Sequence, residues 1–480
     1  MKFGWKIALV ALLIVLGVVL VAIGLMLGGR FFDGYYLAYN INNKEGTCTI
    51  TKCVSFAAKE ITVPEAIGNH RVTEIGAYAF ANQKKLTGIS LPEGITRIGM
   101  AAFYECKNLA QISLPKSVTS IESFAFFGCD GLTSVSISEA VTTIGAGVFE
   151  KCNNLKTAVI PTSAIHTLPA DSITSVVITS GKSIGNSAFR DFKNLTSITI
   201  SPSVETMGLG VFQGCKNITT ATVPTCAISQ LPKENLTHVT VNGGSHIDAK
   251  AFLYAPNLMS VTISETIQSI GSMAFSGCYK LVEVYNFSSL SITKGSIDNG
   301  HIGRYALNIY STAEEASKAW TDENGYLFFE DGDACYLLGY MGENAELILP
   351  KDCNGKPYII HQYAFYSHKN LTSITFPESV LEIEGYAFYG CSTLTDITLP
   401  DRLLQIGEYA FADCQKLTEV SFGKSITTIG AFVFEDCNKL NRILFRGTVQ
   451  MWKAVKQGYN WSYYTPAHEI VCTDGTIPLN

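Results

Sequence analysis

Phenylalanine recurs every 23 residues along two stretches of this chain. Alanine, isoleucine, leucine and cysteine positions recur with it. A fixed period in the twenties, with several apolar positions repeating together, is typical of coils stacked into a solenoid. The recurring residues are Phe80, Phe103, Phe126 and Phe149 in the first stretch, and Phe365, Phe388, Phe411 and Phe434 in the second.

The coil at 394–416 shows what the repeat positions do. Its first segment, LTDITL, alternates with a period of two and predicts a short strand with one buried face. Leu403 and Ile406 begin a second extended piece, and Gly407 permits a tight corner. The segment Tyr409–Phe411 is too short for a stable α-helix, so we expect a single helical or 3₁₀ turn there.

No coil of this size can bury its apolar side alone. Stacking at the spacing of neighbouring strands, roughly 4.8 Å, would place each Leu, Ile and Phe against its copy in the next coil. Each repeat position would then become a ladder along the stack. The repeat therefore predicts a mostly β solenoid with a parallel sheet on one face.

Cysteine occupies one position of the repeat in most coils. Adjacent coils would bring these thiols within disulfide distance, so a disulfide ladder competes with free thiols that act as small apolar side chains. Ala255 and His368 fill the same position elsewhere, which favours free thiols. A bridge between Cys48 and Cys53, outside this position, stays open. The cysteines of the ladder are Cys106, Cys129, Cys152, Cys215, Cys278, Cys391, Cys414 and Cys437.

The N-terminal segment has a different character. An unbroken apolar run at 7–29 follows Lys2 and Lys6 and ends at Arg30. It is long enough to cross a bilayer and longer than the core of a signal peptide. The lysines before it favour an N-terminus inside the cell. We expect a single-pass signal anchor in the cell membrane, with residues 1–6 in the cytoplasm and the repeats outside; a cleaved signal peptide is the alternative.

Two segments with a Gly-Tyr start and alternating aromatic residues predict β-hairpins that cap a stack. Terminal repeats need such caps, because they would otherwise expose an apolar end. Whether the second hairpin interrupts the solenoid or packs inside it stays open. After Phe445 the period stops, and we expect a short helix near Met451–Gln457 and a strand near Glu469–Cys472. The predicted order is a capping hairpin at 31–60, repeat block 1 at 61–310, a linker with the second hairpin at 311–345, repeat block 2 at 346–445 and a C-terminal cap at 446–480.

Residues that carry enzyme chemistry form no motif in this chain. The sequence has no HExxH, Walker A, GxSxG or GxGxxG pattern, and its eight histidines are scattered. The 23-residue spacing of the cysteines does not match the paired ligands of a zinc site. Glu330–Asp333 slightly resembles a calcium loop, but it lacks the alternate ligands, and an Asp-Gly hairpin turn is the better interpretation. We predict no catalysis, no metal and no cofactor.

The charge also narrows the choice of partners. The formal net charge is -6, and no basic stripe interrupts the repeats. Nucleic-acid binding proteins need such a stripe to meet the phosphate backbone. Nucleic acid is therefore not an expected partner.

One outward position of each coil is organised enough to suggest binding. It lies between the two buried residues of the strand and carries Ser or Thr in coil after coil, Ser90 and Thr240 included. Stacked strands would align these residues into an uncharged polar column, the kind of surface on which repeat proteins hold partners. Such columns also stabilise strand pairing with no ligand, so both interpretations stand. The candidate ligand face comprises Ser113, Ser136, Thr199, Thr222, Thr262, Thr375, Thr398 and Ser421.

The unit LTSITxPxSVxxIGxxAFxxCxxL, seen at 371–394 and 394–416, resembles the BspA-like leucine-rich repeat family of bacterial surface proteins. The resemblance covers about 60–445. It implies an α/β, mostly β, right-handed stack of leucine-rich-repeat coils, displayed at the surface and attached to macromolecules of a host or of neighbouring cells. The family defines no catalytic residues to carry over.

Three functions are consistent with these features. The leading hypothesis is a membrane-anchored extracellular protein that mediates macromolecular binding or adhesion through a protein or glycan ligand. The second is a structural spacer without a ligand of its own. The third is a glycan-binding protein that uses the aromatic residues of the C-terminal region, although such residues more often close the core of the last coil. These residues are Trp452, Trp461, Tyr463 and Tyr464.

Overall fold

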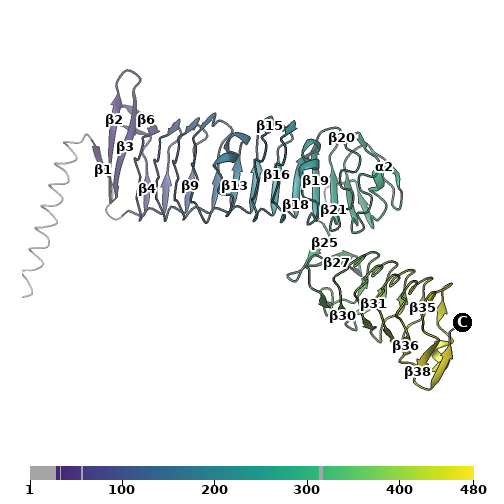
Figure 1. Cartoon of the computed structure of the whole chain (residues 1–480). Helices are drawn as coiled ribbons and strands as arrows, with labels where there is room; N and C mark the ends of the chain where they lie inside the picture. Colours follow the sequence, from purple (N-terminus) through teal and green to yellow (C-terminus); the bar gives the residue numbers. More distant parts are fainter. Residues whose placement is uncertain (1–28, 33, 56–57, 313–316, 480) are drawn as a thin grey trace, which may run out of the picture. The chain divides into compact units, whose positions relative to one another are not determined.

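The computed structural model of the chain describes residues 29–32, 34–55, 58–312 and 317–479 (Figure 1). These residues form two compact units, which are described separately below. Unit 1 is Met1–Pro232 with Val241–Gly244, and unit 2 is Lys233–Thr240 with Ser245–Asn480. The predicted boundary between the two repeat blocks, at 311–345, therefore lies within unit 2.

The apolar run at 7–29 lies outside the described residues, apart from Gly29, which begins strand β1 (Gly29–Phe32). Across the part of the chain that the structure describes, no helix has the length and apolar character that a membrane span needs. The membrane anchor stays a prediction.

Unit 1 begins with a three-stranded antiparallel cap. Strand β1 pairs with β2 (Tyr35–Asn42), and β2 pairs with β3 (Thr47–Ser55). Strand β3 then pairs in parallel with β6 (His70–Ile75), which starts the coil stack (Figure 1). Cys48 and Ile50 of β3 are buried, so the hairpin covers the apolar end of the stack, as predicted.

Each full coil of unit 1 contributes two short strands, one on each side of the coil (Figure 1). Strand β5 (Ala66–Ile67) folds back on β6. One row continues from β6 through β8 (Arg97–Ile98), β10 (Ser120–Ile121) and β12 (Thr143–Ile144), and later through β15 (Ser183–Ile184) and β17 (Thr206–Met207). The other row holds β4 (Glu60–Thr62), β7 (Gly88–Ser90), β9 (Gln111–Ser113), β11 (Ser134–Ser136), β13 (Thr157–Ile160), β14 (Ser175–Ile178), β16 (Ser197–Ile200) and β18 (Thr220–Pro224).

Two shortened coils of unit 1 replace the phenylalanine turn with a 3₁₀ helix. These helices are η1 (Thr162–Thr167) and η2 (Thr225–Gln230), and each follows a proline in extended conformation. Ala164 and Ile165 of η1 are buried, so the shortened coil keeps an apolar core without a phenylalanine.

Unit 2 begins with the remaining coils of the first repeat block. The residues of β19 (His238–Gly243) are divided between the two units. Strands β21 (Ser260–Ile263), β23 (Glu283–Asn286) and β24 (Asn308–Tyr310) pair in parallel. On the other side of the coils, β20 (His246–Ile247) pairs with β22 (Ser269–Ile270), and the short α2 (Asp298–His301) follows.

The second hairpin repeats the topology of the first. Strands β25 (Ala319–Thr321), β26 (Tyr326–Asp331) and β27 (Ala334–Tyr340) are antiparallel, and β27 then pairs in parallel with β29 (Tyr358–Ile360). The tight connection between β26 and β27 contains Gly332 at φ 64°, which confirms the hairpin turn predicted for Glu330–Asp333.

The second hairpin is buried on both faces. Leu327 and Phe329 pack with Met259 and Val282 of the preceding coils. Phe328, between them in sequence, packs into the core of the following coils. Because successive side chains of a strand point to opposite faces, one strand serves two cores. The hairpin therefore packs within unit 2 as a layer between two sets of coils.

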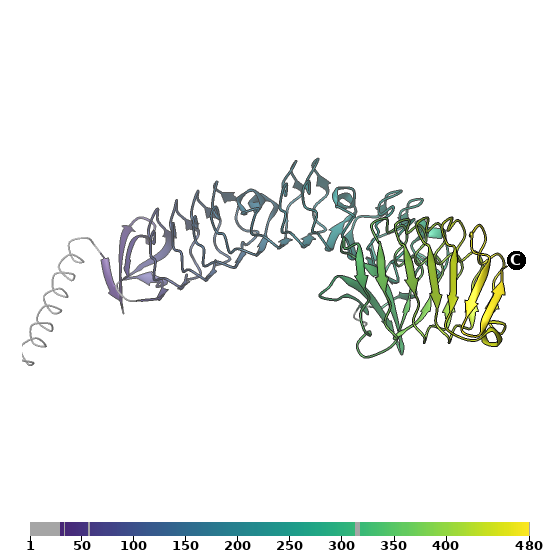
Figure 2. The same cartoon turned by 60° about the horizontal axis from the view of Figure 1, so that its bottom comes forward.

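The second repeat block again has two rows of parallel strands, which lie side by side in Figure 2. The C-terminal cap closes its last coil with α3 (Val449–Trp452), shorter than the helix expected near Met451–Gln457, and with the strand expected at Glu469–Cys472. One row contains β29, β31 (Val380–Ile383), β33 (Gln405–Ile406), β35 (Thr428–Ile429) and β37 (Lys456–Gln457), and the other contains β28 (Glu346–Ile348), β30 (Ser373–Thr375), β32 (Asp396–Thr398), β34 (Glu419–Phe422), β36 (Arg442–Phe445) and β38 (Glu469–Cys472). The last strand, β39 (Gly475–Pro478), pairs with β38 in the antiparallel direction.

The phenylalanine ladder predicted from the period is confirmed. The Phe388 and Phe411 rings stack with centroids 5.0 Å apart, and Phe411 stacks on Phe434 at 5.7 Å. In unit 1, Phe103 stacks on Phe126 at 5.1 Å. These five rings are fully buried.

The helical or 3₁₀ turn predicted at Tyr409–Phe411 is wrong. Tyr409 and Asp413 have left-handed backbone, with φ of 53° and 58°. The amides of Tyr409, Phe411 and Asp413 donate to carbonyls of the following coil at 2.8–3.0 Å. A 3₁₀ turn would direct every amide back into its own coil. The observed alternation of conformations instead lets every second residue bond to the next coil, which offsets the cost of a left-handed residue.

The cysteines of the ladder are buried free thiols. The presence of other residue types at the same repeat position favoured this outcome over disulfides. Each donates through Sγ to the carbonyl of the ladder phenylalanine one coil earlier, as Cys106 does to Phe80 at 3.0 Å and Cys437 to Phe411 at 3.1 Å. Burial raises the pKa of Cys106 to about 12, so this thiol stays protonated and unreactive. Cys48 and Cys53 are unbridged.

Candidate ligand-binding face

The strand rows align the candidate residues much as the repeat predicts. In unit 1, Ser113 lies beside Ser90 in the register of β7 and β9. Thr199 and Thr222 are likewise register partners in β16 and β18. Ser113 and Ser136 are exposed, whereas Thr199 and Thr222 are half-buried.

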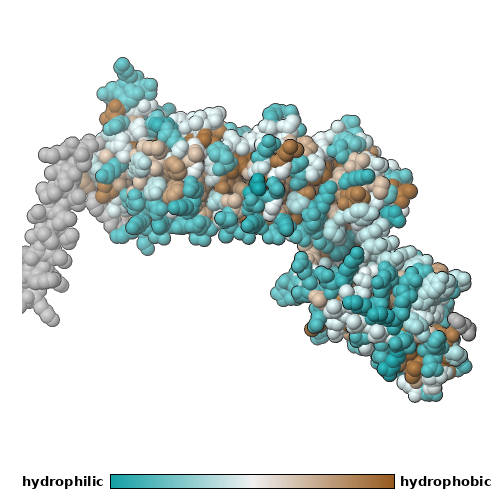
Figure 3. All heavy atoms as spheres, viewed as in Figure 1, coloured by the Kyte–Doolittle hydropathy of each residue, from teal (hydrophilic) through white to brown (hydrophobic). Residues whose placement is uncertain are grey.

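The column of unit 1 is not continuously polar. Between Ser136 and Thr199 the register runs through Val159 and Val177 of the duplicated segment. Val159 is 37% exposed. In the view of Figure 3 the coils of unit 1 are covered mainly by hydrophilic and neutral residues, with hydrophobic ones scattered among them. The column of unit 1 therefore presents hydroxyls on both sides of two consecutive valines.

In the second repeat block the column is shorter than predicted. Thr375 and Thr398 are exposed. Ser421, the register partner of Thr398, is buried, and its hydroxyl accepts a hydrogen bond from the Arg446 guanidinium at 3.0 Å. Arg446 also pairs with Asp401 at 2.9 Å. The placement of Ser421 on an open ligand face is therefore wrong, because a long side chain from the C-terminal cap covers it.

Around Thr262 the column becomes a cleft. A cavity of about 320 Å³ opens there, a size in the range of small-ligand sites. Thr262 is the register partner of Tyr285, and Tyr285 that of Tyr310, whose ring stacks on it at 4.8 Å. We call this cavity the Thr262 cleft. Its polar lining is His238, Thr240, Ser260, Thr262, Tyr285 and Ser317.

The buried side chain of Glu283 accepts hydrogen bonds from three residues near the cleft. Glu283 has no exposed surface, and its two oxygens accept from the Ser317 hydroxyl at 2.5 Å and the Lys318 amide at 3.0 Å. The Tyr285 hydroxyl also donates to it, at 3.3 Å. Because Ser317 and Lys318 belong to the segment predicted as linker and second hairpin (311–345), this network fastens that segment to strand β23. Burial lowers the pKa of His238, so its imidazole is neutral at pH 7.

The sequence indicated only part of the Thr262 cleft. Thr262 and Thr240 were found from the repeat, whereas Tyr285 departs from the Ser/Thr pattern and Ser317 lies in the linker segment, outside the repeat. The signal for Tyr285 was its register position in the repeat. No local pattern pointed to Ser317, since a contact between distant segments brings it to the sheet.

The cleft offers neutral hydrogen-bond donors and acceptors beside an aromatic ring. These groups suit the hydroxyls of a sugar or the amides of a peptide. The arrangement is thus that of a recognition surface.

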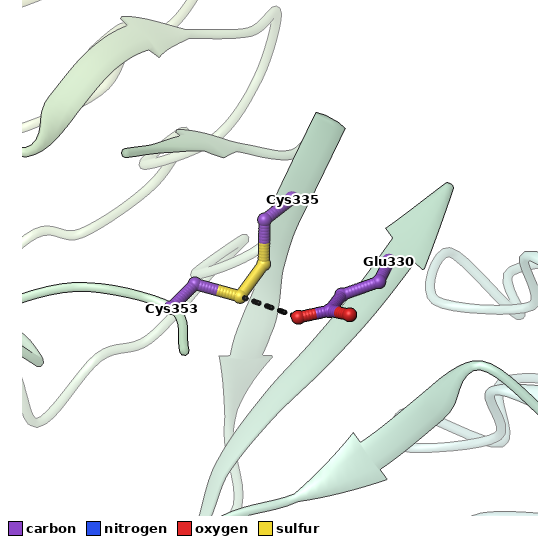
Figure 4. Close-up of side chains that lie close together, drawn as sticks. All are labelled: Glu330, Cys335 and Cys353. Atoms are coloured by element: carbon purple, nitrogen blue, oxygen red, sulfur yellow. Dashed lines mark hydrogen bonds between the residues drawn. A yellow bond between two sulfur atoms is a disulfide. The ribbon is translucent and has the colours of Figure 1, made fainter. Parts of the chain in front are cut away.

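Glu330, Cys335 and Cys353 form a second cluster, on the second hairpin and the loop after it (Figure 4). Their ligand atoms lie within 4.8 Å of one another, a spacing that could hold a metal ion. However, the two sulfurs are joined in a disulfide, which leaves no thiolate to act as ligand. Cys353 Sγ lies 3.8 Å from Glu330 Oε1, and the Asn354 amide donates to the same oxygen at 2.8 Å. This disulfide was not predicted.

Two of the four aromatic residues singled out in the C-terminal region, Trp452 and Trp461, close the core. Trp452 and Trp461 are 2% and 6% exposed. Both indole rings contact Phe422, with centroids at 5.3 and 6.2 Å. The faces of these rings are therefore not open to stack on a sugar, which favours the capping role. Tyr464 is exposed.

Comparison with models of known protein families gives one match to this chain. The family model described as the BspA type leucine rich repeat region matches in six copies, at residues 73–180, 168–282, 245–297 and 358–454. None of the curated proteins matches the chain.

Several solved bacterial structures are similar. A leucine-rich repeat protein from Bacteroides ovatus is 21% identical, with 92% of this chain and 99% of that chain covered and a TM-score of 0.29. A leucine rich cell surface protein from Faecalibacterium prausnitzii is 23% identical, with 89% and 97% covered and a TM-score of 0.28. The leucine-rich repeat protein of T. pallidum is 23% identical, with 38% and 87% covered and a TM-score of 0.28.

Proposed function

Because the chain belongs to the BspA type leucine-rich repeat family, we propose that it acts at the bacterial cell surface as a macromolecular binding or adhesion protein. In this proposal the apolar run at 7–29 anchors it in the membrane, and the repeats lie outside the cell. Its ligand is an extracellular protein or glycan, and no chemical step is involved.

The disulfide between Cys335 and Cys353 supports the location outside the cytoplasm. Disulfides persist in oxidising compartments and are rare where cellular reductants keep thiols reduced. The free thiols of the ladder do not conflict with this, because burial withholds them from oxidants.

The Thr262 cleft is the observation that carries the binding function. It lies on the polar column, combines hydroxyls with an aromatic ring, and has a size in the range of a ligand site. The register beyond Thr262 continues through Tyr285 and Tyr310, whose rings would extend the contact surface, as extended faces do in other repeat proteins.

The test is a screen of the purified full chain against arrays of glycans and of extracellular proteins. For any ligand found, Thr262→Arg should weaken binding at least tenfold, because the long charged side chain fills the cleft. Gln268→Arg, which adds the same charge at an exposed position of the same coil, should leave binding unchanged. Equal binding by both variants would exclude the cleft as the site.

The spacer role has one observation in its favour. Threonine hydroxyls at two other repeat positions bond to backbone carbonyls of the neighbouring coil, as Thr119 does to Thr96 at 3.2 Å at one position and Thr418 to Thr395 at 3.1 Å at the other. Threonine thus stabilises the stack without any ligand. Arrays with no specific ligand would favour this role over binding.

A further inference from the structure

Lys280 occupies a repeat position where several coils carry asparagine. In those coils the side-chain amide donates to a backbone carbonyl of the preceding coil, as Asn108 does to Lys84 at 2.6 Å and Asn217 to Lys193 at 2.7 Å. Asn257 does the same in unit 2. The side chains of Asn108 and Asn217 are exposed. Lys280 differs in residue type and in burial, with 7% of its surface exposed.

The surroundings of Lys280 hold its ammonium in place without neutralising it. Nζ donates to Oδ1 of Asn257 at 3.0 Å. Strand β27 gives it room, because a Cβ at Gly339 would lie 2.4 Å from Nζ. No ion pair joins Lys280 to a carboxylate among the residues that the structure describes. Burial lowers the pKa of Lys280 to about 8, so it remains mostly a cation at pH 7.

This ammonium forms part of the wall of a cavity of about 490 Å³ within unit 2. Tyr279 and Tyr363 stack in its wall with ring centroids 4.4 Å apart. Tyr254 and Tyr366, which also line the cavity, are 64% and 37% exposed. We call this cavity the Lys280 pocket.

The Lys280 pocket is positive although the chain is acidic. The described residues that line it include no Asp or Glu. Burial lowers the pKa of His368, so this imidazole is neutral at pH 7. Burial also raises the pKa of Tyr279 and of Tyr363, which keeps these phenols protonated. Lys280 therefore supplies the charge of the pocket.

We propose that the Lys280 pocket binds an acidic sugar unit, with the carboxylate of the sugar paired to the Lys280 ammonium. A buried cation without a counter-ion is unfavourable, and a carboxylate at this place would remove that cost. The C–H face of a sugar ring packs well on tyrosine, while the phenol hydroxyls can bond to its hydroxyls. The volume of the pocket lies within the range of small-ligand sites. The pocket shares no residue with the Thr262 cleft, so this inference goes beyond the proposed function.

The test is calorimetric titration of the purified full chain at pH 7 with D-glucuronate as the probe. D-glucose, which lacks the carboxylate, and acetate, which lacks the ring, should each bind at least tenfold more weakly. Glucose binding as tightly would exclude the charge pairing, and acetate binding as tightly would exclude the sugar. Absence of glucuronate binding would overturn the proposal.

Matched lysine variants make the test specific. Lys280→Met removes the charge, keeps the length of the side chain, and should weaken glucuronate binding at least tenfold. Lys416→Met is the control, because Lys416 fills the same repeat position but is exposed, and it should bind as the unaltered chain does. Tyr254→Ala, an exposed change that leaves the core intact, should weaken binding severalfold. Glucuronate binding by Lys280→Met at unaltered affinity would overturn the assignment.

The pH profile separates charge pairing from a general loss of structure. Lys280 is protonated below about pH 8 and the glucuronate carboxylate is ionised above about pH 5. Affinity should be constant from pH 6 to 7 and fall as pH rises through 8 to 10. The titratable groups that face Lys280 are His368 and the tyrosines Tyr254, Tyr279, Tyr340, Tyr363 and Tyr366, with Arg304 near Tyr279. Burial lowers the pKa of His368, so this imidazole does not titrate between pH 8 and 10, and a flat profile there would contradict the pairing.

Discussion

Each buried phenylalanine of the ladder is expected to contribute to the free energy of unfolding, and Phe411 is an example. Its side chain has no exposed surface and lies between two stacked rings, those of Phe388 and Phe434. Phe411→Ala should lower the free energy of unfolding by about 3–5 kcal/mol, since it removes buried apolar surface and leaves a cavity. Urea unfolding followed by circular dichroism measures the change.

An exposed aromatic residue provides the control for this prediction. Tyr464 is 61% exposed, so Tyr464→Ala should change the free energy of unfolding by less than about 0.5 kcal/mol. A loss below about 1 kcal/mol for Phe411→Ala would mean that the ladder does not stabilise the coils.

At this scale the repeat predicted burial well and backbone conformation poorly. The period placed Phe411 and Cys414 in the core because hydrophobic periodicity reports which face is buried. It could not show that Tyr409 is left-handed, because that conformation depends on hydrogen bonds to the next coil. Ser421 was misplaced for a similar reason, since Arg446 reaches it from 25 residues further along the chain.

Among the elements, the second hairpin depends on a disulfide that the first lacks. Cys335 lies in β27 and Cys353 in the loop before β29, 18 residues apart. Closing a loop of this length stabilises a fold by about 3 kcal/mol through the loss of freedom in the unfolded chain. Cys335→Ala with Cys353→Ala should lower the melting temperature by several degrees, measured by calorimetry.

Reduction of the unaltered chain provides an independent check of the same element. Dithiothreitol should lower the melting temperature of the unaltered protein and leave that of the double alanine variant unchanged. The described ladder cysteines are unpaired, so no other described bond would respond. An equal response of both proteins would show that a different disulfide is being reduced.

Both hairpins were predictable as elements, whereas the packing of the second was not. Gly-Tyr starts and alternating aromatic residues identified them, and the Asp-Gly turn placed the reversal near Gly332. That Leu327 and Phe328 belong to different cores follows from contacts with residues tens of positions away. The disulfide was missed because pairing between Cys335 and Cys353 depends on three-dimensional proximity.

At the scale of the whole molecule, the proposed location makes a direct prediction. If the chain is anchored by its N-terminus with the repeats outside, proteinase K added to intact cells should degrade a C-terminal tag while cytoplasmic markers survive. A tag protected in intact cells and degraded after lysis would contradict the location. An anchor-deleted variant should retain its tag under the same treatment, because it would stay inside.

The double role of β26 has a consequence for how such a chain can change over time. Leu327 and Phe329 serve one core and Phe328 serves the other. Inserting one amino acid before this strand would exchange the two sets and expose both cores to unsuitable neighbours. Adding or losing a whole coil elsewhere does not change which core each of these side chains faces. Related chains with this hairpin are therefore expected to differ in repeat number more readily than in the spacing of these three positions.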